Sequence, residues 1–275
     1  MNSNTLALPA NISPQARPAF YWTIADMLVL ARCQLKRLRR NPVDLVIAAL
    51  QPIVLLVLFR YFVGGAIAVA GTSYVNYLVA GFLVIALLLG SGATGTGLAE
   101  DLQRGLVDRF RSLPMAKSAV LTGRILADLL RSSLIILVVW AVGLLIGFRP
   151  AGTVLDWAAA LGLLLLASLL FSWFAALLGS TLPSVEAVQA ASLTAIFLLM
   201  FLSNAYVPTS TMPGWLRAFA EHQPVSVIIS AVRGLLLNQP DAAATWQAIA
   251  WCVGLLVVII PLAVRAYGRR TAQAA

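Results

Sequence analysis

The segment Glu100-Asp-Leu-Gln-Arg-Gly-Leu-Val-Asp-Arg-Phe-Arg-Ser-Leu-Pro114 carries six charged side chains in the middle of a chain that is otherwise mostly apolar. Of the 275 residues, 61% are hydrophobic and only 11% are charged, and the mean hydropathy is +0.92. A soluble domain of this size does not need so much apolar sequence, whereas a protein that lies in a bilayer does. The charged segment is therefore predicted to be a water-exposed link between two spans of an integral membrane protein.

Apolar runs of roughly 20 residues can cross the hydrocarbon layer as helices. The runs in this sequence lie at about 45–67, 74–97, 126–148, 154–180, 186–207 and 246–267. The predicted fold is all-α, a single domain over 1–275 with six transmembrane helices. Almost no chain remains for a soluble domain.

The basic residues predict how the chain is oriented, because Lys and Arg in short loops are retained on the cytosolic side. If both termini are cytosolic, fifteen of the nineteen basic residues fall inside. The outer side then receives only Arg60, Arg149, Arg217 and Arg233. The inverted arrangement breaks the rule, so we expect both termini to be cytosolic.

The net charge of +9 does not indicate a nucleic-acid partner. The cations cluster within a few residues of the predicted span ends, where anionic headgroups account for them. Cys33 lies in the N-terminal arm and Cys252 in the last span, a placement that suggests neither a disulfide nor a metal cluster. We therefore expect membrane lipid as a contact, no nucleic acid, and no cofactor or metal bound by this chain.

The N-terminal arm at about 20–40 is apolar first and basic last, the reverse of a cleavable signal peptide. Apolar residues recur in it at near-helical spacing, which predicts an amphipathic helix on the inner leaflet. A simple charged anchor is an equally good interpretation of the same residues.

The charged segment at 100–114 has the pattern of a short amphipathic helix. One face is apolar and comprises Leu102, Leu106, Phe110 and Leu113. The opposite face alternates in sign and comprises Asp101, Arg104, Asp108 and Arg111, with spacings at which ion pairs support a helix. Such a helix can seat its apolar face in a groove of a soluble partner. The alternative is a solvated loop helix that only sets topology.

Three parts of the sequence, taken in order, resemble the ABC type-2 exporter permeases, in particular the branch of the daunorubicin/doxorubicin-resistance permeases. They are the charged segment, the continuation Met115-Ala-Lys-Ser-Ala-Val-Leu-Thr-Gly-Arg124-Ile-Leu-Ala-Asp128, and a later external segment. The last contains Phe201-Leu-Ser-Asn-Ala-Tyr-Val-Pro208, Met212-Pro-Gly-Trp-Leu216, Gln223-Pro-Val-Ser226 and Val232-Arg-Gly-Leu235. With the predicted topology, the resemblance covers nearly the whole chain.

The resemblance implies the membrane subunit of an ATP-driven exporter in a bacterial cell (inner) membrane, not an enzyme. It implies two copies of a separate cytosolic ATPase, which binds ATP and Mg, and a second copy of this chain or a related permease. The charged segment becomes a coupling helix that meets the ATPase through Glu100, Asp101, Arg104, Gly105, Asp108, Arg109 and Arg111. The pathway is expected between two copies, lined partly by spans one, two and five. Its apolar walls favour a lipid, glycolipid or lipophilic drug.

The segment at 209–240 alternates apolar stretches with prolines, so no piece is long enough to cross. Short re-entrant helices fit, since irregular backbone at membrane depth must be buried in protein or line a cavity. We expect an outer gate that includes Glu221, Pro224 and Arg233. Arg233 lies among apolar residues and needs a partner, for which Glu221 is our hypothesis. Simple snorkelling of Arg233 to the headgroups is the alternative.

Other apparent signals indicate packing or anchoring rather than chemistry. Gly90-Ser-Gly-Ala-Thr-Gly95 matches a dinucleotide fingerprint only formally, because it lies inside an apolar span, where small residues ease helix packing. The single histidine, His222, is a weak catalytic candidate. Asp128 and Arg131 are interpreted as interfacial charges. The aromatic residues at span ends are interpreted as interfacial anchors, and they include Tyr61, Tyr74, Tyr206, Trp157, Trp246 and Tyr267.

Two other classes of function remain as alternatives, a membrane enzyme or scaffold that acts without ATP and an ion-coupled secondary carrier. The first predicts a cluster of polar catalytic groups at one depth. The second predicts ionisable residues near the membrane midplane or paired broken helices. The sequence shows neither pattern.

Overall fold

The computed structural model describes residues 42–65, 69, 71–104, 117–209, 212–239 and 241–273. Within these ranges the regular secondary structure is helical. The helices are α2 (Pro42–Leu58), the π-helix η1 (Phe59–Val63), α3 (Tyr74–Gln103), α5 (Lys117–Leu145), α6 (Val154–Thr181), α7 (Val185–Phe201), α8 (Gly214–His222), α9 (Pro224–Leu236) and α10 (Ala242–Gln273). The predicted N-terminal helix at about 20–40 and most of the predicted coupling helix lie outside the described residues.

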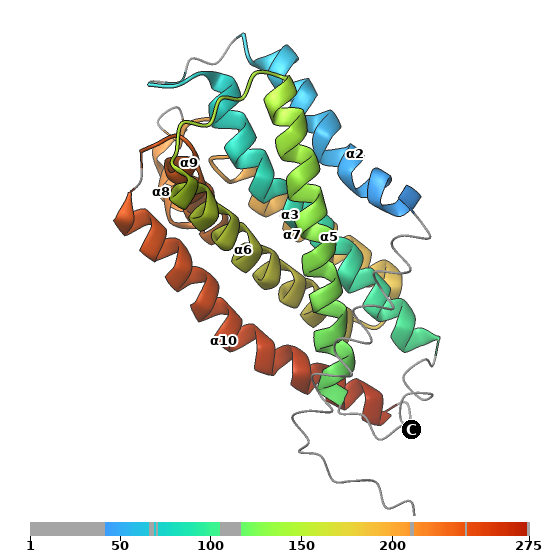
Figure 1. The fold of residues 1–275 in the computed structure, drawn as a ribbon. Coiled ribbons are helices and arrows are strands. Elements are labelled where there is room, and N and C mark those ends of the chain that lie inside the picture. The colour runs from blue at the N-terminus through green and yellow to red at the C-terminus, as the bar shows by residue number, and fades with distance from the viewer. Residues whose placement is uncertain are drawn as a thin grey trace, which may run out of the picture.

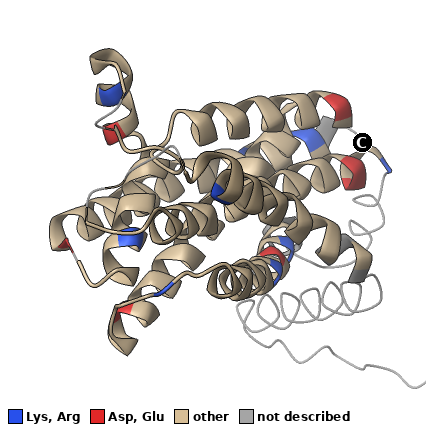
Figure 2. Cartoon of the chain, turned by 90° about the horizontal axis from the view of Figure 1, so that it is seen from above, with Lys and Arg blue, Asp and Glu red and all other residues tan. Residues whose placement is uncertain are grey.

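The long helices run alternately in opposite directions and give the bundle two ends (Figure 1). One end, the Glu100 end, holds the last turns of α3, α6 and α10 and the first turns of α2, α5 and α7. The other end, the Arg233 end, holds the first turns of α3, α6 and α10 together with α8 and α9. Most positions of the described helices carry neither Lys, Arg, Asp nor Glu (Figure 2).

The core forms around α3 and α6 (Figure 1). On one side α10 packs against α6, and on the other side α2 packs against α3 and α5. α3 and α6 approach so closely that a Cβ atom at Gly95 would lie 2.7 Å from the carbonyl oxygen of Ala175. Gly179 of α6 meets the backbone of Gly95 in the same way. Small residues let helix backbones pack this tightly in a membrane. The interpretation of the Gly90–Gly95 stretch as a packing surface is confirmed.

Local sequence signals fix several helix ends. α6 begins at a capping box in which Thr153 and Asp156 exchange side-chain and backbone hydrogen bonds. Ser73 and Ser184 accept hydrogen bonds from the first turns of α3 and α7. Beyond the end of α5, Gly147 has a φ of 102°, which glycine adopts without steric cost. These caps set where the long helices start and stop, and so place the two ends of the bundle.

Five helices are long and apolar enough to cross a membrane: Val46–Val63, Tyr74–Gln103, Leu121–Leu145, Val154–Thr181 and Ala242–Thr271. The span predicted at 186–207 is helical only as α7, Val185–Phe201, which has 17 residues. At 1.5 Å per residue this is about 25 Å, shorter than the roughly 30 Å hydrocarbon layer. The rest of that span, 202–207, is bent, because Ser203 donates its hydroxyl to the carbonyl of Met200 and competes with the helical pattern.

The interpretation of span-end aromatic residues as interfacial anchors was wrong for three of them. Tyr74, Tyr206 and Tyr267 are buried, with exposed fractions of 7%, 4% and 3%. All three belong to the buried core, Tyr74 and Tyr267 from helices and Tyr206 from the bent chain after α7. Tyr61 and Trp246 remain exposed, as an anchor requires.

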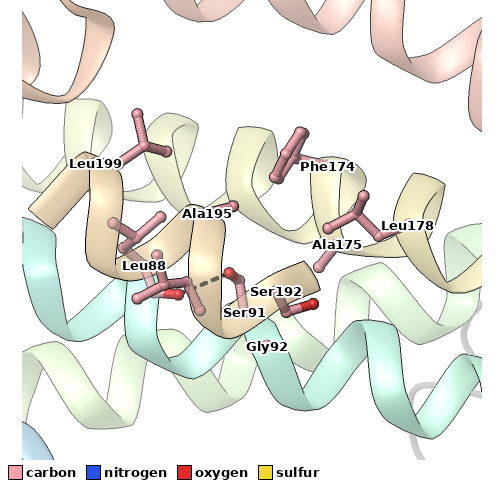
Figure 3. Close-up of a pocket in the computed structure, with 10 residues that line it drawn as sticks. Leu88, Ser91, Gly92, Phe174, Ala175, Leu178, Ser192, Ala195 and Leu199 are labelled. Atoms are coloured by element: carbon pink, nitrogen blue, oxygen red, sulfur yellow. Dashed lines mark hydrogen bonds between the residues drawn. The ribbon is translucent and has the colours of Figure 1, made fainter. Parts of the chain in front are cut away.

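A small pocket lies between α3, α6 and α7 (Figure 3). Its volume is about 10 Å³, close to the space that one water molecule needs. Apolar side chains line most of it, with Ser91 and Ser192 as polar members. Ser91 donates to the carbonyl of Leu88, whereas the hydroxyl of Ser192 is buried without a partner. The pocket is far too small for a drug-sized molecule.

Candidate functional site

The Glu100 end carries the first part of the predicted coupling segment. Glu100 and Arg104 form an exposed ion pair of 3.3 Å within the last turn of α3. Asp101 instead faces α5, where it pairs with Arg124. Acidic side chains at a helix C-terminus are unfavourable next to the partial negative charge there, and Arg124 compensates for Asp101. Of the predicted coupling residues, Gly105, Asp108, Arg109 and Arg111 lie outside the described residues.

A second charged contact lies deeper in the bundle and was not predicted. Asp128 of α5 is 8% exposed and accepts a hydrogen bond from Ser172 of α6. Thr94 of α3 lies beside the same carboxylate, and Arg131 approaches it to 4.0 Å. One carboxylate thus connects three helices. The interpretation of Asp128 as an interfacial charge was wrong, because α3 and α6 close over it.

The signal for this contact is present in the sequence. Arg124, Asp128 and Arg131 follow one another at steps of four and three and alternate in sign. That is the pattern from which the helix at 100–114 was predicted. Applied to 124–131, it indicates one charged stripe along α5, although it does not show that the stripe faces the core.

Arg270 in the last turns of α10 is a further contact that the sequence did not reveal. Its guanidinium donates to the carbonyl oxygens of Gly179, Leu182 and Pro183, the last at 2.8 Å. These carbonyls belong to the end of α6 and the turn that follows it, where no helical donor is available. Arg270 therefore fastens α10 to α6 at the Glu100 end.

The predicted outer segment forms two short helices at the Arg233 end. Pro224 occupies the first position of α9, where its fixed φ suits a helix start. Glu221, near the end of α8, accepts hydrogen bonds from Arg217 at 2.7 Å and from Thr209 at 3.1 Å. The guanidinium of Arg217 holds the pKa of Glu221 below its ordinary value. The expected pair of Arg233 with Glu221 is not formed, since Glu221 pairs with Arg217 one turn away.

Arg233 is held by neutral groups instead. Its guanidinium carbon lies 3.5 Å from the centre of the Tyr77 ring, a cation–π contact. One of its nitrogens donates to the carbonyl of Asn204 at 3.0 Å, and the Tyr77 hydroxyl donates to the same carbonyl at 2.7 Å. The side-chain amide of Asn204 donates to Ser230 of α9. The guanidinium of Arg233 thus packs against the first turn of α3. A side chain that only snorkelled to the headgroups would not make these contacts.

Aromatic rings surround the same end. Tyr206 stacks on Phe59 of η1 with ring centres 4.4 Å apart and meets Phe82 of α3 edge-on at 5.4 Å. These rings join η1, α3 and the bent chain after α7. The five-residue π-helix η1 shifts the end of α2 by part of a turn, a device that is frequent at functional sites.

Among the described residues, no group of three or more His, Cys, Asp or Glu side chains could hold a metal ion. Charged contacts link α3, α5, α6 and α10 at the Glu100 end, while aromatic and neutral polar contacts close the Arg233 end.

The family model described as ABC-2 type transporter matches residues 26–237. The chain belongs to the ABC-2 type transporter family. It is 33% identical over 265 residues to the daunorubicin resistance ABC transporter permease protein DrrB1 of Streptomyces coeruleorubidus, covering 95% of this chain and 93% of that protein.

Two further relatives widen the family. The chain is 30% identical over 273 residues to the probable doxorubicin resistance ABC transporter permease protein DrrC of Mycobacterium tuberculosis, with 95% of both chains covered. It is 26% identical to the putative transport permease ycf38 of Porphyra purpurea, covering 79% of this chain and 76% of that protein. Family membership and the apolar helices together make this a multi-pass membrane protein.

Proposed function

We propose that this chain is the permease subunit of an ATP-driven exporter and that a separate cytosolic ATPase binds ATP and Mg. Membership of the ABC-2 family, with similarity to two drug-resistance permeases over most of the chain, carries the proposal. Those relatives are named as transporter permeases, which leaves ATP hydrolysis to another subunit. Two ATPase copies and two permeases, identical or related, make the working unit.

The proposed topology has six crossings with both termini cytosolic, in a bacterial cell membrane. α7 is short, but the bent chain after it continues to the Arg233 end, where the carbonyls of Asn204 and Tyr206 accept hydrogen bonds from Tyr77 and Tyr74 of α3. α7 and 202–207 together therefore supply the sixth crossing. The Glu100 end is then cytosolic and the Arg233 end is external, with α8 and α9 as the re-entrant pair.

In this proposal the coupling helix at 100–114 contacts the ATPase. Glu100 and Arg104 are exposed at its start and are available to a partner. Asp101 is engaged with Arg124, so its role is to transmit displacement from α3 to α5. Asp128 then passes it on from α5 to α6 through Ser172. Gly105, Asp108, Arg109 and Arg111 complete the proposed partner surface.

The cargo is proposed to be a lipophilic drug, with a lipid or glycolipid as the other amphipathic candidates. The pocket between α3, α6 and α7 is too small for any of these, which supports a pathway between two copies. α2 and α7 expose apolar side chains that could form its wall, among them Ile47 and Leu50 on α2 and Phe197 and Phe201 on α7. α3 is mostly buried within the chain and can add little. Glu221, Pro224 and Arg233 are proposed to lie at the outer gate.

The decisive test is to purify the chain from its own membrane in mild detergent and to identify co-purifying proteins by mass spectrometry. A stoichiometric partner with a P-loop is the expected result. Recovery of the chain alone, under conditions that keep a known exporter complex intact, would remove the ATPase and favour the membrane-enzyme or ion-coupled alternatives.

A second test uses charge reversal at the proposed contact. Arg109→Glu is expected to lower both transport and transport-linked ATPase activity, because it puts a like charge against a surface that receives Arg109. Arg149→Glu is the matched control, since Arg149 is an exposed arginine at the opposite end. Both variants should reach the membrane in wild-type amounts. Equal activity of the two variants would contradict the coupling role.

A further inference from the structure

A pocket of about 290 Å³ opens at the Arg233 end, between the loop before α3 and the end of α9. Its polar lining consists of Thr72, Tyr77, Ser230, Arg233 and Gln239. The volume is at the lower edge of the range of small-ligand sites and is ample for one headgroup. The pocket is distinct from the contacts through which the Glu100 end is proposed to work.

Within the part of the chain that the structure describes, no carboxylate forms an ion pair with Arg233. The ion pairs among the described residues join Arg104 to Glu100, Arg124 to Asp101, Arg131 to Asp128 and Arg217 to Glu221, and none includes Arg233. Arg233 instead faces an aromatic ring, a carbonyl and hydroxyls. A charge in such surroundings normally has a partner.

Part of the hydrogen-bonding capacity of Arg233 is also unused within the described structure. The carbonyl of Asn204 already accepts from Arg233 and from Tyr77, which fills its two lone pairs. The Nε atom of Arg233 is buried and has no hydrogen-bond partner among the described residues. A guanidinium carries five N–H donors in a fork that matches carboxylate and phosphate oxygens. Water can occupy donors of this kind, but it cannot neutralise the charge.

We propose that this pocket binds an oxyanion, the phosphate or carboxylate of an amphipathic molecule's headgroup, with Arg233 as its counter-charge. The Tyr77 ring holds the guanidinium from one side, and the hydroxyls of Thr72 and Ser230 lie in the same lining. The end of α9 is tied to the loop before α6 by hydrogen bonds from Ala151 and Gly152 to the carbonyl of Leu236. The pocket therefore lies at the rim of the bundle, which in the proposed topology is the level of the external headgroups.

The test is a thermal-unfolding titration of the purified full-length chain in a non-ionic detergent. Dioctanoyl phosphatidylglycerol is the lipid probe, dioctanoyl phosphatidylcholine is the zwitterionic control, and inorganic phosphate is the free oxyanion. We expect phosphatidylglycerol to raise Tm saturably and phosphatidylcholine to raise it less, because the choline cation offsets the charge of its phosphate. A response to inorganic phosphate as well identifies a site for the free oxyanion, whereas a response to the lipid alone identifies a headgroup site.

Arg233→Gln is expected to raise the apparent Kd for phosphatidylglycerol about tenfold, which corresponds to about 1.4 kcal/mol. Arg149→Gln, which removes an exposed arginine at the same end, should leave it unchanged. If Arg233→Gln does not fold, Thr72→Phe narrows the pocket and keeps the Arg233 contacts, and it should weaken the response in the same direction. The proposal is overturned if the two lipids act alike on the wild type, or if the folded variants respond as the wild type does.

Discussion

The two ends of the bundle handle charge in opposite ways. At the Glu100 end, cations meet carboxylates between helices, as Arg124 does with Asp101, or meet the open carbonyls of a helix end, as Arg270 does with Gly179. At the Arg233 end, the half-buried Arg233 meets a tyrosine ring and a backbone carbonyl, and stacked aromatic rings close the gaps. The same fold therefore combines an ionic end and an aromatic end.

The difference indicates what each end can do. Ion pairs between helices are strong only while their geometry holds, and breaking a buried pair is costly. Helices joined in this way move together when one of them is displaced. Aromatic and neutral contacts change little when an anion binds or dissociates nearby. Such contacts therefore suit an end where Arg233 is proposed to bind an anion.

The largest expected effect comes from the buried carboxylate of the ionic end. Asp128→Leu leaves Arg131 without its nearest carboxylate and the hydroxyl of Ser172 without an acceptor. Breaking a buried pair from one side typically costs about 3 kcal/mol, so Tm of the detergent-purified chain should fall sharply. Asp128→Asn keeps an acceptor oxygen for Ser172 and should cost less. If Asp128→Leu unfolds at the wild-type temperature, the three-helix contact does not hold the ionic end together.

The second-largest expected loss of stability is at the close contact between α3 and α6, two helices that run from one end of the bundle to the other. In Gly95→Ala the new Cβ atom meets the carbonyl oxygen of Ala175 at 2.7 Å, so the backbones must separate. Overpacking of this kind costs about 1–3 kcal/mol and outweighs the gain in helix propensity. Gly90→Ala is the control, because its Cβ atom meets only Ile135 at an ordinary 3.6 Å. It should stabilise the helix by up to about 1 kcal/mol. Equal Tm values for the two variants would contradict the close packing.

At the aromatic end, two tyrosines differ in one hydroxyl contact. The hydroxyl of Tyr77 donates to the carbonyl of Asn204, whereas the hydroxyl of Tyr206 is buried without a partner. Tyr77→Phe should therefore lower the free energy of unfolding by about 1 kcal/mol, while Tyr206→Phe should be neutral or stabilising. Both keep the ring, so chemical denaturation of the two variants isolates the hydroxyls. A larger loss for Tyr206→Phe would show that its hydroxyl has a partner in solution.

The sequence was sufficient for the coarse fold because each long helix is a separate apolar run. α6 matches its predicted span within one residue, whereas α3 begins where predicted but continues to Gln103, into the predicted coupling helix. The Gly95 contact follows from small residues in an apolar run. The failures have a common cause, since they depend on which helix faces belong together. Nothing near Asp128 in the sequence shows that Ser172, 44 residues away, closes over it, and the choice of Arg217 over Arg233 as the partner of Glu221 depends on how α8 and α9 turn.

The smallest expected effect is at the one ion pair that the described part of the Arg233 end contains, between Arg217 and Glu221. Because the folded-state pKa of Glu221 is lowered, the pair adds stability above the unfolded-state pKa and loses it as pH falls through the folded-state pKa. Glu221→Gln should therefore lower Tm slightly at neutral pH and have no effect once the carboxyl is protonated. Arg217→Gln should reduce the pH dependence of this difference, because Thr209 and His222 also lower the pKa of Glu221, and Arg233→Gln should not reduce it. The opposite pattern would restore Arg233 as the partner of Glu221, and would make the Arg233 end as ionic as the other.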